Sequence, residues 1–415
     1  MHVQAGPTLS AAQLAVRVLA PFAAGYFLSF LFRTVNAVLA PHISAAIHLD
    51  AAALGLMTAM YFLAFGAFQL PLGVLLDRFG PRRVEAALLL FAAAGAGAFA
   101  VAEAAGVLIL GRALVGLGVS ACLMAALKAN VQWYPPARLP MLNGIILSAG
   151  GLGAVAATAP VQAALAFTDW RGIYAGLAVI TLGAAVLLFA VVPDRKDAAQ
   201  APESLAAQLR EIARIFRDRR FLRVMPVGAM AMGAFLAVQG LWAGPWLRDV
   251  AGQQPAGVAA GLTAMAAGMT AGFLLMGVIA ERLARHGVPV AVVGGAGMAA
   301  FLAVLALMAA GWGGAPLVLC VAFGFFGSAS SLMYAVVTAL YPPHLAGRAT
   351  TSLNLTMFLV AFLLQWGLGA VIGLWPKGAG GWPPEAHMVA LAIPAALLAA
   401  ALLWYAAGLR KTISR

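Results

Sequence analysis

The sequence predicts an all-α membrane protein of twelve transmembrane helices, arranged as two pseudo-symmetric six-helix bundles. The first observation is the composition: 64% of the 415 residues are hydrophobic and only 9% are charged, against about 25% in an average soluble domain. The second is that apolar runs of about 20 residues, each long enough to cross the hydrocarbon core, recur along the chain. The third is a pair of loop sequences that each occur twice, which indicates an internal duplication.

Proline, glycine and charged clusters separate the hydrophobic spans. The twelve spans lie approximately at 17–40, 50–72, 84–105, 107–131, 141–165, 172–193, 222–247, 256–280, 288–310, 315–340, 350–374 and 387–408. A long polar segment falls between the sixth and seventh spans. We therefore expect an N-terminal bundle over 1–193, a linker over 194–221 and a C-terminal bundle over 222–415.

The basic residues are distributed unevenly between the two sides of the membrane. With a cytoplasmic N-terminus, 19 of the 25 lysines and arginines fall on the cytoplasmic side, three fall outside and three lie within spans. The positive-inside rule then predicts that both termini are cytoplasmic. Membrane topology thus accounts for most of the net charge of +12, and we expect no nucleic-acid partner.

The linker has the pattern of a short amphipathic helix. Its apolar face would contain Leu205, Leu209, Ile212 and Phe216, with Ser204 as the N-cap. We expect this helix to lie on the inner membrane surface, where its arginines would contact anionic lipid. The alternative is an unstructured basic tether.

Two loops carry the internal repeat. GVLLDRFGPRR (73–83) follows the second span, and GVIAERLARHG (277–287) follows the eighth. The aligned pairs are Gly73 with Gly277, Asp77 with Glu281, and Arg78 with Arg282. A Tyr-Pro-Pro sequence also follows both the fourth and the tenth span, at Tyr134 and Tyr341. Two matched motifs at a nearly constant offset predict a duplicated six-helix unit.

The first of these loops resembles the signature loop of the major facilitator superfamily, G-x-x-x-D-R-x-G-x-R-[RK]. The run GRALVGLG (111–118) resembles the fourth-helix motif of the same superfamily. The resemblance covers essentially the whole chain and implies two bundles around a central cavity that opens alternately to each side. It implies a multi-pass transporter, which we expect to be a monomer in a bacterial inner membrane and to need no cofactor, rather than an enzyme.

The repeated loops are interpreted as a conformational gate. A carboxylate at this place can cap a helix or pair with a guanidinium of the other bundle, and such pairs can form in one conformation and break in another. The candidate gate residues are Gly73, Asp77, Arg78, Arg82, Arg83, Arg112, Gly277, Glu281 and Arg282. The alternative is that the loop arginines only anchor the topology, and that Arg112 forms a structural pair with Glu103.

Arg33 places a permanent positive charge inside the first span. Such a charge costs ~2.5–3.5 kcal/mol at the bilayer centre even on lenient scales. With the span ending at Pro41, Arg33 would lie about 10 Å below the outer end at 1.5 Å per residue. Tyr26, Phe30 and Arg33 share one helical face, with Asn36 beside it. This pattern is typical of a helix face that lines a cavity.

The sequence offers Arg33 no internal counter-ion. Asp50, Glu85 and Glu103 all fall close to span ends, and no carboxylate is expected at mid-depth. An anion from solution, the substrate, is the natural partner. Without a mid-membrane acid we expect exchange, facilitated uptake or carriage of a protonated substrate, because proton-driven carriers usually need a titratable group near the site.

The first two spans also resemble the organic-anion and organophosphate branch of the superfamily. In that branch an arginine at the position of Arg33 binds the anionic group of the substrate. The phosphate-ester antiporters carry a second arginine on helix seven, where this chain has Gln239 and Trp242. The resemblance with this departure favours a monoanion such as a carboxylate, bound by one bidentate arginine and neutral donors. The other candidate cavity residues are Tyr334, Asn354 and Gln365, with Lys128 as a ligand or a snorkelling cation.

Three other functions remain open. A multidrug exporter would suit Arg112, although the fifth span lacks the Gly-Pro pair of exporters. A copper importer could use the soft thioethers of spans seven and eight, which are Met225, Met230, Met232, Met265 and Met269. A membrane enzyme or sensor is the third, but none of the usual catalytic motifs is present. Cys122 and Cys320 form no metal-binding pattern, and we expect no bound metal.

Overall fold

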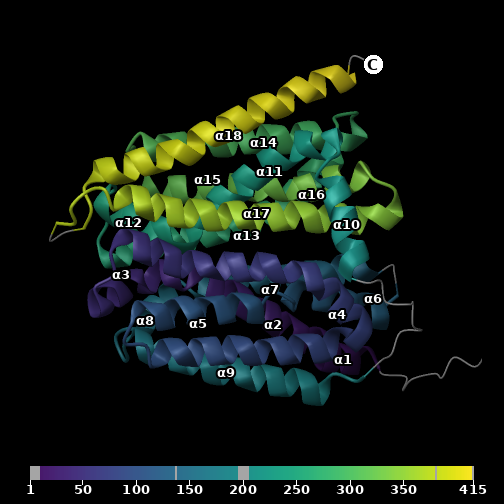
Figure 1. The fold of residues 1–415 in the computed structure, drawn as a ribbon, viewed down its shortest axis with the longest axis horizontal. Coiled ribbons are helices and arrows are strands. Elements are labelled where there is room, and N and C mark those ends of the chain that lie inside the picture. Colours follow the sequence, from purple (N-terminus) through teal and green to yellow (C-terminus); the bar gives the residue numbers. More distant parts are fainter. Residues whose placement is uncertain (1–9, 136–137, 195–204, 379–380, 414–415) are drawn as a thin grey trace, which may run out of the picture.

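The structure is a computed structural model that describes residues 10–135, 138–194, 205–378 and 381–413 (Figure 1). Within these residues, eleven helices are long and apolar enough to cross a membrane. One of them, α4 (Ala51–Ala100), contains two spans, because Gly80 interrupts the helix with φ 79° and ψ 161°. A side chain is disfavoured at such a φ, and glycine permits the break. The described chain thus has twelve spans, and the predicted fold class is confirmed.

The first half of the chain supplies six spans. Besides α4, its helices are α1 (Ala11–Leu14), α2 (Ala20–Thr34), α3 (Asn36–Ile47), α5 (Ala105–Gly118), α6 (Cys122–Trp133), α7 (Leu139–Ala156), α8 (Ala159–Ala164) and α9 (Trp170–Val191). Consecutive short helices form single spans, as α2 and α3 do. A π-helical turn at Ala15–Leu19 joins α1 to α2.

The second half repeats this arrangement after the linker helix α10 (Leu205–Ile215). Its helices are α11 (Arg219–Ala237), α12 (Ala243–Asp249), α13 (Pro255–Arg285), α14 (Val290–Ala309), α15 (Pro316–Gly327), α16 (Leu332–Ala339), α17 (Pro343–Ile372) and α18 (Pro384–Ile413). A π-helical segment, Val238–Trp242, joins α11 to α12, and a 3-10 turn, Ser328–Ser331, joins α15 to α16.

The two halves lie side by side with their helices roughly parallel (Figure 1). In the first half α4 packs against α5 and α9; in the second, α13 packs against α15 and α11 against α17. The halves meet mainly where α4 contacts α17 and α7 contacts α13. We call the end of the molecule that carries α1, α10 and the C-terminal end of α18 the linker end, and the end that carries α3, α8 and α12 the opposite end.

The internal repeat is visible in the helix packing. Gly116 on α5 lies against the backbone of Tyr61 on α4, and Gly324 on α15 lies against the backbone of Met265 on α13. A Cβ added at either glycine would lie less than 3.0 Å from a backbone oxygen. Small residues allow helices to approach this closely. The same contact in both halves supports the predicted duplication.

The first span is longer than the sequence indicated. The helix continues through Pro41 to Ile47 and ends at His48, which is left-handed with φ 54°. Arg33 therefore lies 14 residues before the helix end, or ~21 Å at 1.5 Å per residue. The expected depth of about 10 Å is wrong, because the helix continues through Pro41 instead of ending there. Arg33 is deep in the span.

The predicted linker helix is present as α10, while its expected cap, Ser204, lies outside the described residues. Ile212 and Ile215 are buried, and Glu211 pairs with Arg348 on α17. These side chains therefore face the helix bundles rather than the lipid surface that the sequence suggested, because amphipathicity does not say which apolar surface covers the helix.

Candidate functional site

A central cavity of about 360 Å³ lies between the two halves. Helices α2, α4, α6 and α7 line it from one side, and α11, α13, α16 and α17 line it from the other. Of the predicted substrate-binding residues, it brings together Tyr26, Phe30, Arg33, Tyr334 and Asn354. The volume is within the range of small-molecule sites.

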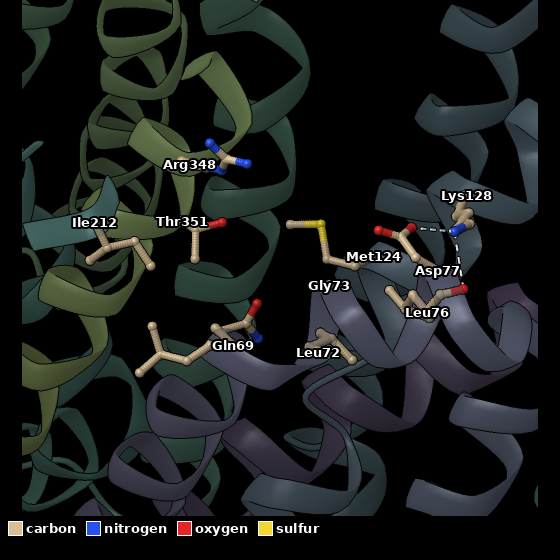
Figure 2. Close-up of a pocket in the computed structure, with 11 residues that line it drawn as sticks. Gln69, Leu72, Gly73, Leu76, Asp77, Met124, Lys128, Ile212, Arg348 and Thr351 are labelled. Carbon is tan, nitrogen blue, oxygen red and sulfur yellow. Dashed lines mark hydrogen bonds and ion pairs between the residues drawn. The ribbon is translucent and has the colours of Figure 1, made fainter. Parts of the chain in front are cut away.

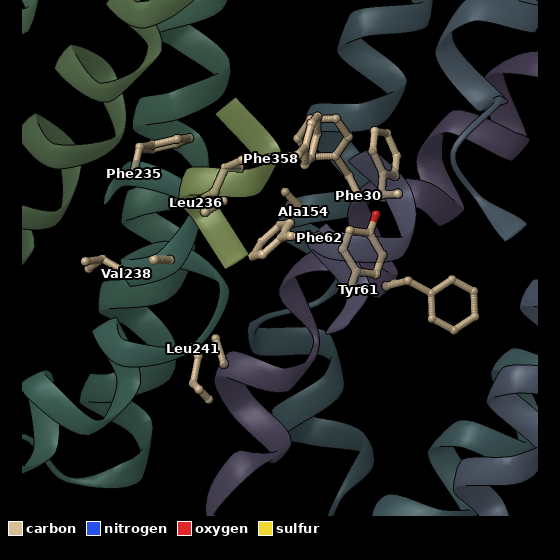
Figure 3. Packing of buried hydrophobic residues seen from close by; sticks show 14 of the residues in the cluster. Phe30, Tyr61, Phe62, Ala154, Phe235, Leu236, Val238, Leu241 and Phe358 are labelled. Carbon is tan, nitrogen blue, oxygen red and sulfur yellow. The ribbon is translucent and has the colours of Figure 1, made fainter. Parts of the chain in front are cut away.

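Arg33 is held in a cage of aromatic rings. Its guanidinium carbon lies 4.4 Å from the ring centre of Phe30, 5.4 Å from that of Phe65 and 5.6 Å from that of Phe358. Tyr61 is also near, at 5.9 Å. Figure 3 shows Phe30, Tyr61 and Phe358 converging where the halves meet. Each cation–π contact contributes on the order of 0.5–2 kcal/mol, so the rings partly stabilise the buried charge.

No acidic residue among the described ones pairs with Arg33. The side chain is 9% exposed, and its Nε has no hydrogen-bond partner among the described residues. A buried charge normally needs a paired charge or hydrogen bonds. Arg33 thus lines the cavity with at least one donor, its Nε, unused among the described residues.

Neutral polar groups line the cavity around it. The Tyr334 hydroxyl donates to Asn354 Oδ1 at 2.6 Å. The amide nitrogen of Asn354 carries two N–H donors that take no part in this bond. Gln69 Nε2 donates to the Ser120 carbonyl oxygen at 3.1 Å. Sequence reasoning missed Gln69, because a single glutamine on an apolar span gives no directional signal.

Four predicted cavity residues join helices instead of lining the cavity. Asn36 Oδ1 accepts from the Tyr174 hydroxyl at 2.5 Å, within the first half. Gln239 Nε2 donates to Met269 Sδ at 3.3 Å. Trp242 Nε1 donates to the Gln365 carbonyl oxygen at 2.9 Å, and the Gln365 side chain is fully buried beside it. Asn36 was misplaced because it lies on the neighbouring face of α3, turned toward α9.

The methionines considered for copper are mostly packed between helices. Met232 and Met269 line the cavity, together with Met124 from the first half. Met225 and Met230 are partly buried against the core, and Met265 is fully buried. Within the described residues no group of three or more His, Cys, Asp or Glu side chains could hold a metal ion.

Close contacts seal the halves together at the opposite end. A Cβ added at Gly369 on α17 would lie less than 3.0 Å from the Ala51 carbonyl oxygen of α4. A Cβ at Gly55 would lie 2.9 Å from the Gln365 carbonyl oxygen, and one at Gly244 would lie 2.6 Å from the Ala37 carbonyl oxygen. Backbone therefore meets backbone across the interface at this end.

The cavity continues toward the linker end. A second pocket of about 270 Å³ shares Gln69 and Met124 with it. Figure 2 shows Ile212, Arg348 and Thr351 on one side of this pocket, and the Asp77–Lys128 pair on the other. The cavity is thus closed at the opposite end and reached from the linker end.

The predicted gate residues of the first loop make contacts within their own half. Asp77 Oδ1 pairs with Lys128 at 2.6 Å, not with a guanidinium of the other bundle as one expectation had it. Lys128 is therefore a partner of the loop rather than a cavity ligand. Arg82 Nε donates to the Phe189 carbonyl oxygen at 2.9 Å, and Arg83 pairs with Asp194 at 2.5 Å.

The other gate residues of the two loops are exposed. Arg78 lies over the ring of its neighbour Phe79, at 5.2 Å. In the second copy, Glu281 pairs with Arg285 at 2.5 Å, and Arg282 is exposed. Gly73 and Gly277 have nothing within 4 Å of an added Cβ, so this conformation does not require glycine at either position.

Arg112 lies inside the first half. It is 1% exposed, and its Nη1 donates to the Phe32 carbonyl oxygen at 2.8 Å. Its guanidinium carbon lies 5.1 Å from the ring centre of Tyr61. The expected pair with Glu103 is wrong, because Glu103 is exposed in the loop before α5. Arg112 instead ties α5 to α2.

Two buried acids were missed. Asp249 at the end of α12 accepts from Arg248 Nε at 2.6 Å and lies 2.8 Å from His387 Nε2 at the start of α18. Glu85 is fully buried on α4, although its place near a span end suggested otherwise. Its spacing of four and seven residues from the buried Leu89 and Ala92 was the available signal.

Comparisons with known proteins agree with this architecture. A family model described as Major Facilitator Superfamily matches residues 22–365. The "Uncharacterized transporter YybO" of Bacillus subtilis (strain 168) is 33% identical over 165 residues, 40% of this chain and 37% of that protein. The "Probable sulfoacetate transporter SauU" of Cupriavidus necator is 27% identical over 181 residues, 43% of this chain and 42% of that protein. The matches thus span about two fifths of these curated relatives.

Solved structures share the fold. A bacterial homolog of the human lysosomal transporter Spinster superposes with a TM-score of 0.74 at 17% identity, covering 94% of this chain and 96% of that one. The nucleoside transporter NupG superposes with a TM-score of 0.73 at 15% identity, covering 93% of this chain and 98% of that one. With the family match over residues 22–365, the chain belongs to the Major Facilitator Superfamily and is a multi-pass membrane transporter.

Proposed function

We propose that the protein carries a small organic anion, a monocarboxylate-type metabolite, across the bacterial inner membrane by alternating access. One observation carries the proposal: Arg33 lines the central cavity, 9% exposed, with no acidic partner among the described residues. A buried cation without a partner is costly. An anion that enters the cavity supplies the missing partner.

The surroundings of Arg33 favour a singly charged ligand with an apolar body. The guanidinium can donate two parallel hydrogen bonds to a carboxylate. Phe30, Phe65 and Phe358 offer apolar contact beside it, and Asn354 offers a neutral donor. Among the described residues that line the central cavity Arg33 is the one cationic group, since Lys128 and Arg348 line only the second pocket. A doubly charged ligand beside Arg33 would therefore keep one charge uncompensated.

The names of relatives support an anionic ligand, although they do not select a single charge, because sulfoacetate carries both a sulfonate and a carboxylate. Besides the sulfoacetate transporter, a "Hexuronate transporter" of Escherichia coli (strain K12) is 27% identical over 167 residues. A "Nitrate/nitrite transporter NrtP" of Picosynechococcus is 31% identical over 128 residues. All of these ligands are anions at neutral pH, and two of the three classes are organic.

The charge distribution orients the carrier. The excess of basic residues predicts that both termini and the linker are cytoplasmic. The linker end is then the cytoplasmic end, and the conformation described here is open to the cytoplasm. The exposed arginines near α10 would lie within reach of anionic lipid headgroups.

Ligand-induced stabilisation of the purified protein tests the proposal. Thermal unfolding in detergent is measured with acetate, lactate, galacturonate, sulfoacetate, nitrate and Cu(I). A ligand at 100 times its dissociation constant stabilises by ~2.7 kcal/mol. We expect a carboxylate to raise the melting temperature of the wild type and not that of Arg33→Ala. Equal responses of the two proteins, or a response to Cu(I) alone, would refute the anion site.

A further inference from the structure

The strongest unassigned feature is the carboxyl group of Glu85. It is 0% exposed and lies inside the first half, away from the lining of the central cavity. Gly25 on α2 faces it directly, because a Cβ added there would collide with Glu85 Oε1 and meet the Cys122 sulfur at 3.8 Å. The absence of a side chain at Gly25 thus makes room for the carboxyl group.

Neither oxygen of Glu85 has a hydrogen-bond partner among the described residues other than the adjacent Cys122 thiol. The Cys122 thiol, a weak donor at best, is the titratable group beside it. Charged or titratable side chains on the helices around it are engaged elsewhere. Tyr26 and Arg33 line the cavity. Further pairs are Arg82 with Phe189, Arg83 with Asp194, Arg112 with Phe32, Lys128 with Asp77, Arg171 with Ala102 and Tyr174 with Asn36. A carboxylate anion is costly to bury in such a place, so the neutral, protonated acid is favoured.

A small crevice of about 10 Å³ lies on the linker side of Glu85, which does not itself line it. It is a separate pocket whose lining includes Phe22, Pro81 and Ala129. These residues lie three, four and seven positions from Gly25, Glu85 and Cys122, on the same faces of the same three helices. Four residues of helix span about 6 Å. A short movement of these helix ends would therefore bring water to the carboxyl group.

From this geometry we infer that Glu85 is a proton-binding site inside the first half, reached from the linker end by a route separate from the substrate cavity. The carboxyl group takes up one proton when the crevice is hydrated and is neutral when buried as described here. The site stands on burial, missing partners and the crevice, and needs no assumption about the substrate.

A second step rests on the proposed function. Gly25, which faces Glu85, is eight residues from Arg33 on the same span, or ~12 Å along the helix. At an effective dielectric constant of about 20, two charges at that distance interact enough to change an affinity roughly tenfold. An anion bound at Arg33 would thus favour the protonated Glu85, and protonation would favour anion binding equally. A carrier so linked moves one proton with each monoanion when Glu85 takes up its proton from the opposite end, once that end has opened, and releases it at the linker end.

Infrared spectroscopy tests the proton site without a substrate. The full-length protein in lipid nanodiscs is titrated, and the carbonyl stretch of protonated carboxyl groups is followed. We expect the wild type to keep such a band at neutral pH. Glu85→Gln should lose it, and Glu103→Gln, which changes an exposed loop acid, should keep it. A wild type without the band, or a band unaffected by Glu85→Gln, overturns the site. Glu85→Asp, which should shift the band, serves if the glutamine variant does not fold.

Proteoliposomes test the coupling separately, with galacturonate as the probe. We expect an inside-alkaline pH gradient to drive accumulation by the wild type. Glu85→Gln should keep exchange at equal pH and lose at least tenfold in gradient-driven accumulation. Unchanged accumulation in this variant overturns the coupling. If no anion stabilises the purified protein, the proposed function fails while the infrared band still decides the proton site.

Discussion

The contact between Gly369 and Ala51 makes a quantitative prediction about the conformational equilibrium. In Gly369→Ala the new methyl group would lie less than 3.0 Å from the Ala51 carbonyl oxygen and 3.0 Å from the Trp242 ring. Backbone cannot yield easily, and overpacking of this kind costs ~1–3 kcal/mol. Only a conformation closed at the opposite end bears this cost. The ratio of open to closed molecules at that end should rise roughly 5- to 150-fold.

Distances between spin labels measure this shift. One label replaces His48 after α3, and the other replaces Gln254 before α13; both positions are exposed and lie in different halves. We expect Gly369→Ala to raise the population with a longer distance between labels. Gly367→Ala is the matched control, because an added Cβ there meets nothing within 4 Å and both changes gain the same helix propensity.

Two results would refute this reasoning. Gly369→Ala could lose ~1–3 kcal/mol of unfolding free energy with no change in label distances, which would mean that α17 and α4 stay in contact in every conformation. Alternatively, Gly367→Ala could shift the label distances equally, which would mean that the close approach of the new methyl group to the Ala51 carbonyl oxygen is not the cause.

Three further predictions concern the ends of the molecule. Gly73→Val should leave the melting temperature unchanged and reduce transport in liposomes at least tenfold, because closure at the linker end needs the empty space beside Gly73. Gly97→Val is the control: it lies on the same helix with equally empty space beside it, and it should transport normally in the same assay. Asp77→Asn should change the unfolding free energy by less than about 1 kcal/mol, since its pair with Lys128 is exposed, yet slow exchange measured in liposomes; normal exchange would contradict a gating role. Asp249→Asn should cost ~3–5 kcal/mol in a thermal or denaturant unfolding measurement, since a buried pair is broken; a loss under about 1 kcal/mol would show that water enters the cluster.

The sequence was sufficient for the span number and for the principal cavity face. Span length and charge asymmetry are properties of each segment, so they do not depend on how helices pack. Tyr26, Phe30 and Arg33 also lie on one face of the helix in the structure, because a helix fixes the angle between residues three and four positions apart. These three residues line the cavity as expected.

The rest depended on which helix faces which. Asn36 is close to Arg33 in sequence, but it turns toward Tyr174 on α9. The partner of Asp77 could be any cation at the linker end, and only the packing of α6 on α4 selects Lys128. The position of Glu85 near a span end suggested an exposed acid, but α2 covers it at Gly25. Periodicity gives the direction of a side chain and not its neighbour.

The matched glycine contacts in the two halves also show how the duplicated unit has diverged. At the contact made by Gly116 the first half has Tyr61, whose ring lies near the guanidinium groups of Arg33 and Arg112. At the contact made by Gly324 the second half has Met265, an uncharged thioether. The first half thus holds the fixed charge at this contact, and the second half contributes an uncharged surface. If the proposed anion binds Arg33, it would move together with the first half during the conformational change, while the second half moves relative to it.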